Sequence, residues 1–302
     1  MLILKTRAPG SMDELKSALQ IAMQIELATL PPYLAAYYTL QGGSPSVAYA
    51  RRIFREIVQE EMLHLTLAGN FLSAIGGTPR LNDPSMVPTY PGLLPMGIGD
   101  DDGDAPGSPL RVGLRRYSTQ LVHDVFMAIE EPEKPHVIPV TGLPAAPALA
   151  FQTIGQFYDS IKSVVTREGE GLFKPGNPAH QITGWFGDDE EIAVHDVASA
   201  IRAIDIIVQQ GEGTPERPID FQGRIPHYYQ FESLWRELKA IVVPVTPANP
   251  MGVVFDASQP MPIPEAGIVP MADDPPLIDL DLHGNPTINR LSREFDWCTH
   301  AC

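Results

Sequence analysis

A carboxylate and an imidazole stand one helical turn apart in the middle of a long apolar segment. Glu61 and His64 lie within residues 47–77, where apolar side chains recur every three or four positions. On a helix, this spacing places both side chains on the face that turns toward the core. An ionised carboxylate is costly to bury without a partner, and a metal ion can provide one. The pattern therefore predicts either a metal site or buried hydrogen bonds to each other or to a neighbouring helix.

The Glu-x-x-His spacing is also the one by which helical bundles present two ligands to a carboxylate-bridged pair of iron ions. Carboxylate oxygen and imidazole nitrogen together suit iron, with manganese as the alternative. A single pair of this kind is a weak signal on its own. Its weight depends on whether other parts of the chain offer matching ligands.

The helix that carries this pair has clear limits in the sequence. Ser44 is placed as an N-cap and Pro45 as the first helical residue. Gly76, Gly77 and Pro79 predict the end of the helix. We therefore expect one long helix with both candidate ligands near its middle.

The first helix of the chain offers a second buried carboxylate. Ser11 and Glu14 match a capping box, and Glu26 falls on the apolar stripe that begins at Leu15. The prolines at positions 31–32 predict either a kink, with the helix continuing to residue 40, or a helix end at residue 30. Glu26 is therefore a candidate ligand from a second helix.

Four further helices are predicted, at about 118–131, 148–165, 196–211 and 227–238. Glu212 continues the apolar stripe of the third of these if the helical phase persists to that point. His227 stands in the first turn of the last helix, where a hydrogen bond to the backbone is an equal alternative to metal binding. Gln156 lies off the apolar stripe of its helix, so periodicity alone gives it no role. His123 and His136 have no partner at ligand spacing, so we expect ordinary surface or packing roles for them.

The remaining segments are rich in proline and glycine. Residues 77–116 predict a long loop excursion over the surface of a helical bundle that spans residues 1–242. Residues 243–302 predict an extended segment that packs on the bundle and ends in a short helix at about 285–295. The tail with Cys298, His300 and Cys302 offers soft-metal ligands, but a disordered terminus is the favoured interpretation.

The net negative charge of the chain argues against nucleic acid and membranes as partners. Its 302 residues include 37 acidic and 21 basic ones, and the formal charge of −16 repels nucleic acid and anionic membrane surfaces. No apolar run approaches a membrane span, and the N-terminus lacks the apolar core of a signal peptide. With only two cysteines, a reducing compartment is indicated. We therefore expect a cytoplasmic protein without nucleic-acid or membrane partners, and the sequence permits a homo-oligomer.

Five stretches of the chain, taken in order, resemble a single family. They are residues 26–33 (ELATLPPY), 60–65 (EEMLHL) with 70–79, 153–158 (TIGQFY), 210–213 (QGEG) and 227–231 (HYYQF). Together they resemble the ferritin-like domain of iminophenyl-pyruvate dimer synthases, which include the oxidative coupling enzymes of the violacein and rebeccamycin pathways. The resemblance runs from about residue 15 to residue 238. It implies an all-α, ferritin-like up-down helical bundle around a two-metal centre.

The resemblance also implies the metal ligands. Carried over position by position, they are Glu26, Glu61 and His64 from the first half and Glu212 and His227 from the second. One position departs from the family pattern, because Gln156 stands where the family usually has glutamate and offers only a neutral amide oxygen. If residue 156 faces the centre, we expect a weakly held second metal, a single metal ion, or altered catalysis. Its helical phase argues that it faces elsewhere.

Two classes of function follow from these residues and this resemblance. The first is a non-haem di-iron oxidoreductase that uses dioxygen on a small organic substrate, such as an amino-acid-derived imine, in secondary metabolism. The second is a ferritin-like metal-binding protein without catalysis. A metal-free bundle whose glutamates make buried hydrogen bonds is a third alternative. Metal content and dioxygen consumption distinguish the three.

Overall fold

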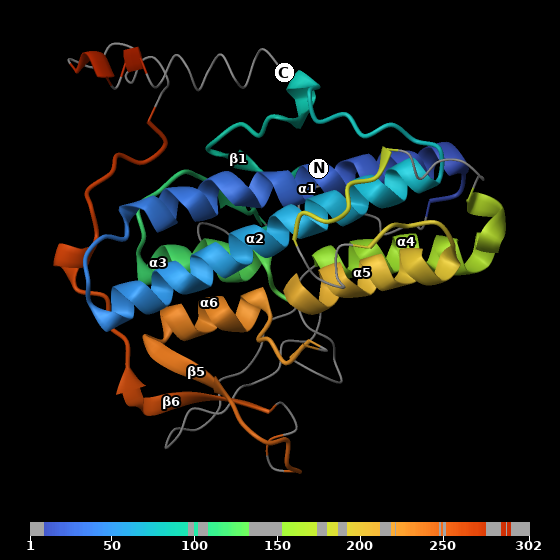
Figure 1. Ribbon diagram of the computed structural model, residues 1–302. Coiled ribbons are helices and arrows are strands. Elements are labelled where there is room, and N and C mark those ends of the chain that lie inside the picture. Colours follow the sequence, from blue (N-terminus) through green and yellow to red (C-terminus); the bar gives the residue numbers. More distant parts are fainter. Residues whose placement is uncertain are drawn as a thin grey trace.

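The computed structural model describes residues 9–95, 100–101, 108–132, 153–173, 180–186, 192–211, 219–220, 222–247, 249, 252–275, 285–287 and 289–290. Two long helices, α1 (Met12–Thr39) and α2 (Pro45–Ala74), run side by side along the molecule (Figure 1). The other helical segments are α3 (Thr119–Leu121) continued by the π-helical η3 (Val122–Met127), α4 (Ile154–Glu168) continued by the 3-10 turn η4 (Gly169–Leu172), α5 (Val197–Gly211) and α6 (His227–Trp235). The predicted all-α bundle is confirmed.

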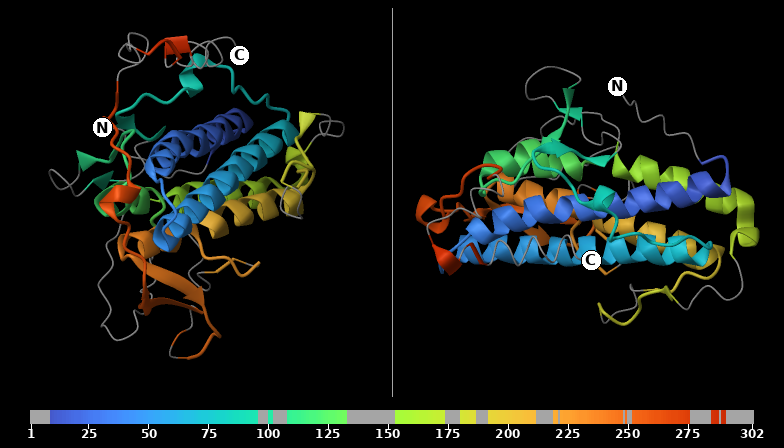
Figure 2. Two further views of the ribbon diagram at one scale, coloured as in Figure 1. Left: turned by 60° about the vertical axis from the view of Figure 1, so that its left-hand side comes forward. Right: turned by 90° about the horizontal axis from the view of Figure 1, so that it is seen from above.

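The shorter helices form two interrupted rows beside the long pair. α3 and α4 lie end to end in one row, and α6 and α5 lie end to end in the other (Figures 1 and 2). α6 packs on η3, and α5 packs on α4. The bundle therefore has two continuous helices and two rows that are broken near their middle. Ends of helices, and not only their sides, reach the centre of the bundle.

Local sequence signals explain the limits of the two long helices. The side chains of Ser11 and Ser44 accept hydrogen bonds from backbone N–H groups three residues later, so both act as N-caps. Past the end of α2, Gly76 takes a positive φ of 76°, which glycine adopts readily. α1 continues through Pro31 and Pro32 to Thr39, so the alternative of a helix end at residue 30 is wrong.

An aromatic cluster packs both long helices against η3 and α6. Tyr33 of α1, Phe54 of α2, Phe126 of η3 and Phe231 of α6 are fully buried. The neighbouring rings among them have centroids 4.9–5.9 Å apart. Burial of each aromatic side chain stabilises the fold by about 1.5–3 kcal/mol relative to exposure. This packing fixes η3 and α6 beside the C-terminal part of α1 and the N-terminal part of α2.

Short antiparallel strands lie outside the bundle. β1 (Gly92–Leu93) pairs with β4 (Arg111–Val112), β2 (Asp100–Asp101) with β3 (Ser108–Pro109), and β5 (Leu238–Val242) with β6 (Val253–Pro260). Single 3-10 turns are η1 (Pro84–Met86) and η6 (Glu265–Gly267). The last bundle helix ends at Trp235, before residue 238, because residues 238–242 pair with β6. The β5–β6 hairpin thus joins residues on both sides of the boundary predicted at residue 242.

The C-terminal segment returns to the bundle. The backbone N–H of Val269 donates to the carbonyl of Thr39 at 2.7 Å, and that of Gln41 donates to the carbonyl of Gly267 at 2.8 Å. These bonds attach the segment to the turn between α1 and α2. The cysteine tail and most of the predicted terminal helix lie outside the described residues. Within the described part of the chain, no helix has both the length and the apolar character that a membrane crossing requires.

Candidate metal centre

Five acidic and imidazole side chains meet where the two rows of helices are broken. They are Glu26 of α1, Glu61 and His64 of α2, Glu130 shortly after η3, and His227 at the start of α6. We call these five residues the ligand cluster. Each of them is at most 3% exposed. Because burial of an ionised group without a partner is costly, the cluster needs either internal compensation or a bound cation.

The ligand cluster divides into two groups that share Glu61. Ligand atoms of Glu26, Glu61 and His64 all lie within 4.8 Å of one another, and the same holds for Glu61, Glu130 and His227. The two imidazole rings are 5.6 Å apart between centroids and tilted by 26°. A carboxylate common to two groups is the arrangement that bridges two metal ions in helical bundles.

Both imidazoles turn the same nitrogen toward carboxylates. Nδ1 of His64 lies 3.5 Å from Oε2 of Glu26. Nδ1 of His227 lies 2.8 Å from Oε1 of Glu61 and 3.5 Å from Oε2 of Glu130. The approach of His227 to these oxygens lacks hydrogen-bond alignment, so its buried Nδ1 has no hydrogen-bond partner among the described residues. A buried imidazole nitrogen in this situation fits a metal ligand.

The other nitrogen of each ring is held from outside the ligand cluster. Nε2 of His64 donates to Oε1 of Gln210 on α5 at 2.8 Å. Nε2 of His227 donates to Oε2 of Glu60 at 2.9 Å. Because both acceptors are oxygens without a proton, Nε2 carries the proton of the neutral ring and Nδ1 keeps a lone pair. Such outer hydrogen bonds fix the tautomer that a metal-binding histidine requires.

Each carboxylate of the ligand cluster accepts a hydrogen bond from a buried hydroxyl. The pairs are Tyr158 with Glu26 (2.6 Å), Tyr33 with Glu130 (2.5 Å) and Thr29 with Glu61 (2.8 Å). Burial, together with the nearby carboxylates, raises the pKa of both tyrosines well above the ordinary value. Both phenols therefore remain donors near neutral pH, and they fix the orientation of the carboxylates.

Without a cation, protons compensate the charge of the ligand cluster. Burial and the neighbouring carboxylate of Glu130 raise the pKa of Glu61 to about 7. Burial alone would lower the pKa of His227, but the carboxylates of Glu130, Glu60 and Glu61 raise it well above the ordinary value. Metal ions would displace these protons on binding.

A small cavity adjoins the ligand atoms. Its volume is about 20 Å³, and it is lined by Glu26, Glu61, His64, Glu130, Ile154, Gly155, Ile207, Val208 and Gly211. A cavity of this size holds about one water molecule. A Cβ atom at position 211 would lie 3.4 Å from Oε2 of Glu130. The absence of side chains at Gly155 and Gly211, where α4 begins and α5 ends, keeps this space open.

The comparisons with known proteins agree with this architecture. The sequence model of the family described as ferritin-like matches residues 19–236. The chain belongs to the ferritin-like family. It is also similar to the crystal structure of a ferritin-like protein from Caulobacter vibrioides, with a TM-score of 0.53, 21% sequence identity and 78% of each chain covered. At this identity the likeness supports the fold alone. No curated protein matches the chain.

The donors of this ferritin-like centre fit two divalent metal ions. Ferritin-like bundles commonly bind two iron ions through shared carboxylates and imidazoles. The ligand cluster provides three carboxylates, hence a formal charge of −3 when they are ionised, and two neutral imidazoles. The shared Glu61, and the Nδ1 of His227 that faces carboxylates without a hydrogen bond, match what two adjacent cations need. This set of oxygen and nitrogen donors accepts either iron or manganese.

Four of the six ligands predicted from the sequence lie together in the ferritin-like centre, namely Glu26, Glu61, His64 and His227. Gln156 lies elsewhere: its Oε1 accepts from the N–H of Thr153 at 3.4 Å, and its own N–H donates to Oγ1 of Thr153 at 3.2 Å. These two bonds form a capping box at the start of α4. Glu212 lies outside the described residues, so its role as a ligand stays a prediction.

Of the two other histidines named in the sequence, the structure describes only His123, which does not join the centre. The side chain of His123 is 46% exposed; its Nδ1 lies 2.7 Å from Asp124, and its ring packs on Trp235 at 4.4 Å between centroids. His136 lies outside the described residues.

Sequence reasoning missed Glu130 and the two residues that hold the imidazoles from outside. Glu130 follows Phe126 by four positions and Val122 by eight, so a helical stripe would have included it. Glu60 and Gln210 carry no such signal, because their partners come from distant segments.

Proposed function

We propose that this protein is a non-haem two-metal oxidoreductase that uses dioxygen on a small organic substrate, with iron as the metal and manganese as the alternative. The observation that carries the proposal is the pair of buried three-ligand groups around the shared carboxylate of Glu61. When bound, the metal ions would supply the electrons that reduce dioxygen. The resemblance to iminophenyl-pyruvate dimer synthases favours an amino-acid-derived imine as the substrate, in secondary metabolism.

The chain's own residues would hold the ions and control protons. Glu26 and His64 would hold one ion, Glu130 and His227 the other, and Glu61 both. Burial of all five side chains keeps bulk water away from the centre.

Two of the ligand carboxylates each accept a hydrogen bond from a phenol, so a proton lies next to each of them. The hydroxyls of Tyr33 and Tyr158 place these protons at Oε1 of Glu130 and Oε1 of Glu26. These phenols would keep each terminal carboxylate turned toward its ion, which is pre-organisation of the kind that catalytic centres need.

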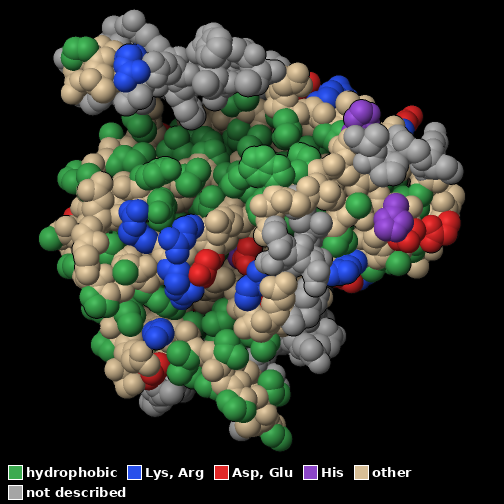
Figure 3. Space-filling model, in the orientation of Figure 1, with side chains coloured by type: hydrophobic (Ala, Val, Ile, Leu, Met, Phe, Trp, Pro, Cys, Tyr) green, Lys and Arg blue, Asp and Glu red, His purple; other side chains and the backbone are tan. Residues whose placement is uncertain are grey.

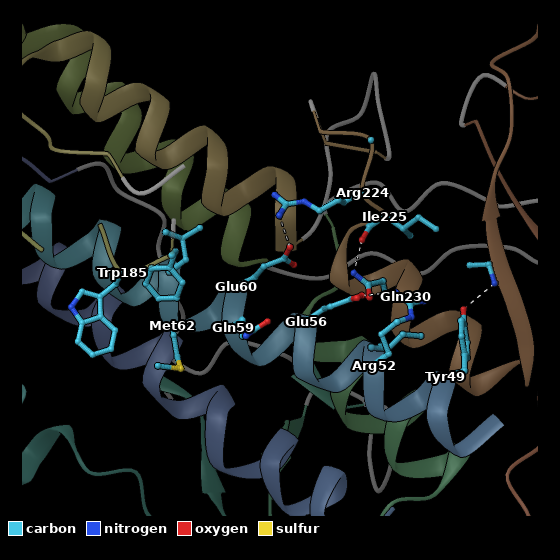
Figure 4. Close-up of a pocket in the computed structure, with 15 residues that line it drawn as sticks. Tyr49, Arg52, Glu56, Gln59, Glu60, Met62, Trp185, Arg224, Ile225 and Gln230 are labelled. Carbon is cyan, nitrogen blue, oxygen red and sulfur yellow. Dashed lines mark hydrogen bonds and ion pairs between the residues drawn. The ribbon is translucent and has the colours of Figure 1, made fainter. Parts of the chain in front are cut away.

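Two spaces of different size support different roles. The cavity at the ligand atoms, about 20 Å³, suits a molecule of the size of water or dioxygen. A pocket of about 680 Å³ lies on the other side of α2 (Figure 4), and this volume is typical of small-molecule sites. The pocket includes Glu60, the acceptor of the His227 ring. We infer that the organic substrate binds in this pocket, adjacent to the centre.

The lining of the larger pocket is both aromatic and charged. Trp185 and Met62 stand at one end, and Arg52 with Tyr49 stands at the other (Figure 4). Trp185 is 81% exposed, an unusual state for so large an apolar side chain. Basic and acidic side chains lie next to each other on this face of the molecule (Figure 3). Such a lining supports a ligand with an aromatic ring and polar substituents.

The second candidate function is metal binding without oxidation of an organic molecule. The observation that favours it is the small size of the cavity at the ligand atoms, which has no room for an organic substrate beside them. In this alternative the pocket outside α2 has no role in catalysis.

Metal content and dioxygen consumption test both candidates. The full-length protein, loaded anaerobically with ferrous iron, should hold about two ions per chain. It should consume dioxygen, and an aromatic imine should increase the rate of this consumption. Glu130→Gln should lower iron content, whereas Glu56→Gln, on the exposed face of α2, should not. Two bound ions without substrate-dependent consumption would favour the second candidate, and absence of bound iron and manganese would reject both.

A further inference from the structure

The two groups of the ligand cluster match closely in their inner contacts. Each contains one terminal carboxylate, one imidazole that presents Nδ1, and a share of Glu61. Each terminal carboxylate also accepts from a tyrosine, at 2.6 Å for Glu26 and 2.5 Å for Glu130. On the inner contacts that the described residues make, two metal ions would be held almost equally.

The outer contacts of the two imidazoles differ in charge. The ring of His64 donates to the neutral amide oxygen of Gln210, whereas the ring of His227 donates to the carboxylate of Glu60. The donor-acceptor distances are nearly equal, 2.8 Å and 2.9 Å. The difference between the groups is therefore the charge of the acceptor and not the geometry of the bond. A carboxylate acceptor makes the imidazole a stronger electron donor through its other nitrogen.

A neighbouring arginine does not cancel the charge of Glu60. Nη1 of Arg224 lies 3.1 Å from Oε1 of Glu60, and Figure 4 shows the guanidinium directed at this carboxylate. The same arginine bonds the buried carboxylate of Asp220 through Nε at 2.8 Å. One guanidinium thus faces two carboxylates. Within the described part of the chain, the outer partner of His227 therefore carries a negative charge that is only partly compensated, whereas that of His64 is the neutral amide of Gln210.

We propose that the two metal positions fill in a fixed order, with the position between Glu130 and His227 first, and that the contrast between Glu60 and Gln210 sets this order. The inference rests on the proposed two-metal centre. Loss of an outer partner of a metal-binding histidine typically lowers metal affinity by about 10- to 100-fold. We expect the two positions to differ in affinity by about that factor. Glu60 and Gln210 are positioning residues here, since neither touches the metal.

Co²⁺ titration of the full-length metal-free protein tests the order without any measurement of activity. Isothermal calorimetry should resolve two binding steps that differ by about 10- to 100-fold in affinity. Crystals grown with one equivalent of Co²⁺ should show anomalous density beside His227 and much less beside His64. This location is measured on the unmodified chain, so it does not depend on whether any variant folds.

Two substitutions on α2 distinguish the effect of the Glu60 carboxylate on metal affinity from the effect of removing any one negative charge. Glu60→Gln makes the acceptor of His227 neutral like that of His64, so the first step should weaken by about 10- to 100-fold and approach the second. Glu56→Gln removes the same charge one turn earlier, where the side chain pairs with Arg52 in the exposed i,i+4 pair. Both of its steps should remain as in the unmodified protein.

Three results would overturn the inference. The first is two Co²⁺-binding steps of equal affinity, and the second is a first Co²⁺ ion that lies beside His64. The third is a Glu60→Gln variant whose first step has unchanged affinity, although the metal-free variant melts at the same temperature as the unmodified protein. Absence of any bound Co²⁺ would overturn the two-metal centre itself, and the ordered filling with it. Two equal steps would leave the two-metal centre standing, so the two failures are distinguishable.

Discussion

Raising the pH of the metal-free protein should lower its free energy of unfolding. The folded pKa of Glu61 is raised from 4.5 to about 7. Between these values the folded state binds more protons than the unfolded state, so stability falls as pH rises through this window. His64 acts in the same direction, because its pKa is raised: burial lowers it, but the carboxylate of Glu26 outweighs burial. The histidine contribution is present below the unfolded value of 6.5 and is lost as pH rises through the folded pKa.

The magnitude follows from Glu61 alone. A change in pKa from 4.5 to about 7 corresponds to roughly 3 kcal/mol between the two ends of the window. The raised values of His64 and His227 add to this loss. Since small domains have total stabilities of about 5–15 kcal/mol, the effect should be large. Added Mn²⁺ should reverse the trend, because metal binding releases protons and is favoured at higher pH.

Urea denaturation at a series of pH values measures this dependence. Glu61→Gln should remove roughly 3 kcal/mol of the decline between about pH 5 and pH 8. Glu56→Gln serves as the matched control, since general repulsion in a chain of charge −16 also grows with pH. An equal decline in Glu61→Gln and in the unmodified protein would refute the assignment of this effect to the ligand cluster.

Three further predictions concern single side chains. Tyr158→Phe should lower the free energy of unfolding of the metal-free protein by about 1.5–3 kcal/mol, because Glu26 loses a buried donor at 2.6 Å; a loss below about 0.5 kcal/mol would contradict this contact. Gln156→Glu should leave the stoichiometry and affinity of iron unchanged, because residue 156 caps its own helix, and a gain of bound iron on titration would place it in the centre. His64→Ala should lower the metal content found by elemental analysis after dialysis, while His123→Ala should not; equal losses would count against the centre.

The sequence predicts the parts of this fold that depend on local chemistry. α2 begins at Pro45 after the cap Ser44, as expected, because caps and prolines act on neighbouring backbone groups. Glu26 and Glu61 were placed on inward faces by periodicity, and both are buried. Local signals of this kind need no knowledge of the rest of the chain.

Contacts between distant segments were beyond local reasoning. The β5–β6 hairpin depends on pairing across a loop, and the helix predicted to end at residue 238 ends at Trp235 instead. Glu130 continues the stripe of Val122 and Phe126 at helical spacing. Its contacts with Tyr33 and His227, however, join distant segments of the chain. Gln156 shows the opposite case, because the capping-box pattern Thr153-x-x-Gln156 is local and is readable in the sequence.

The breaks in the two helical rows themselves favour a charged centre. α6 begins at His227 and α4 begins at Ile154, beside the cavity, so two positive helix ends face the buried carboxylates. α5 ends at Gly211 beside the same cavity, so its negative end favours a cation there. A continuous helix in either row would have faced the ligand cluster with side chains only, and not with a helix end. The interruption therefore supplies partial charges of both signs, which lower the cost of burying three carboxylates and still leave a place for metal ions between them.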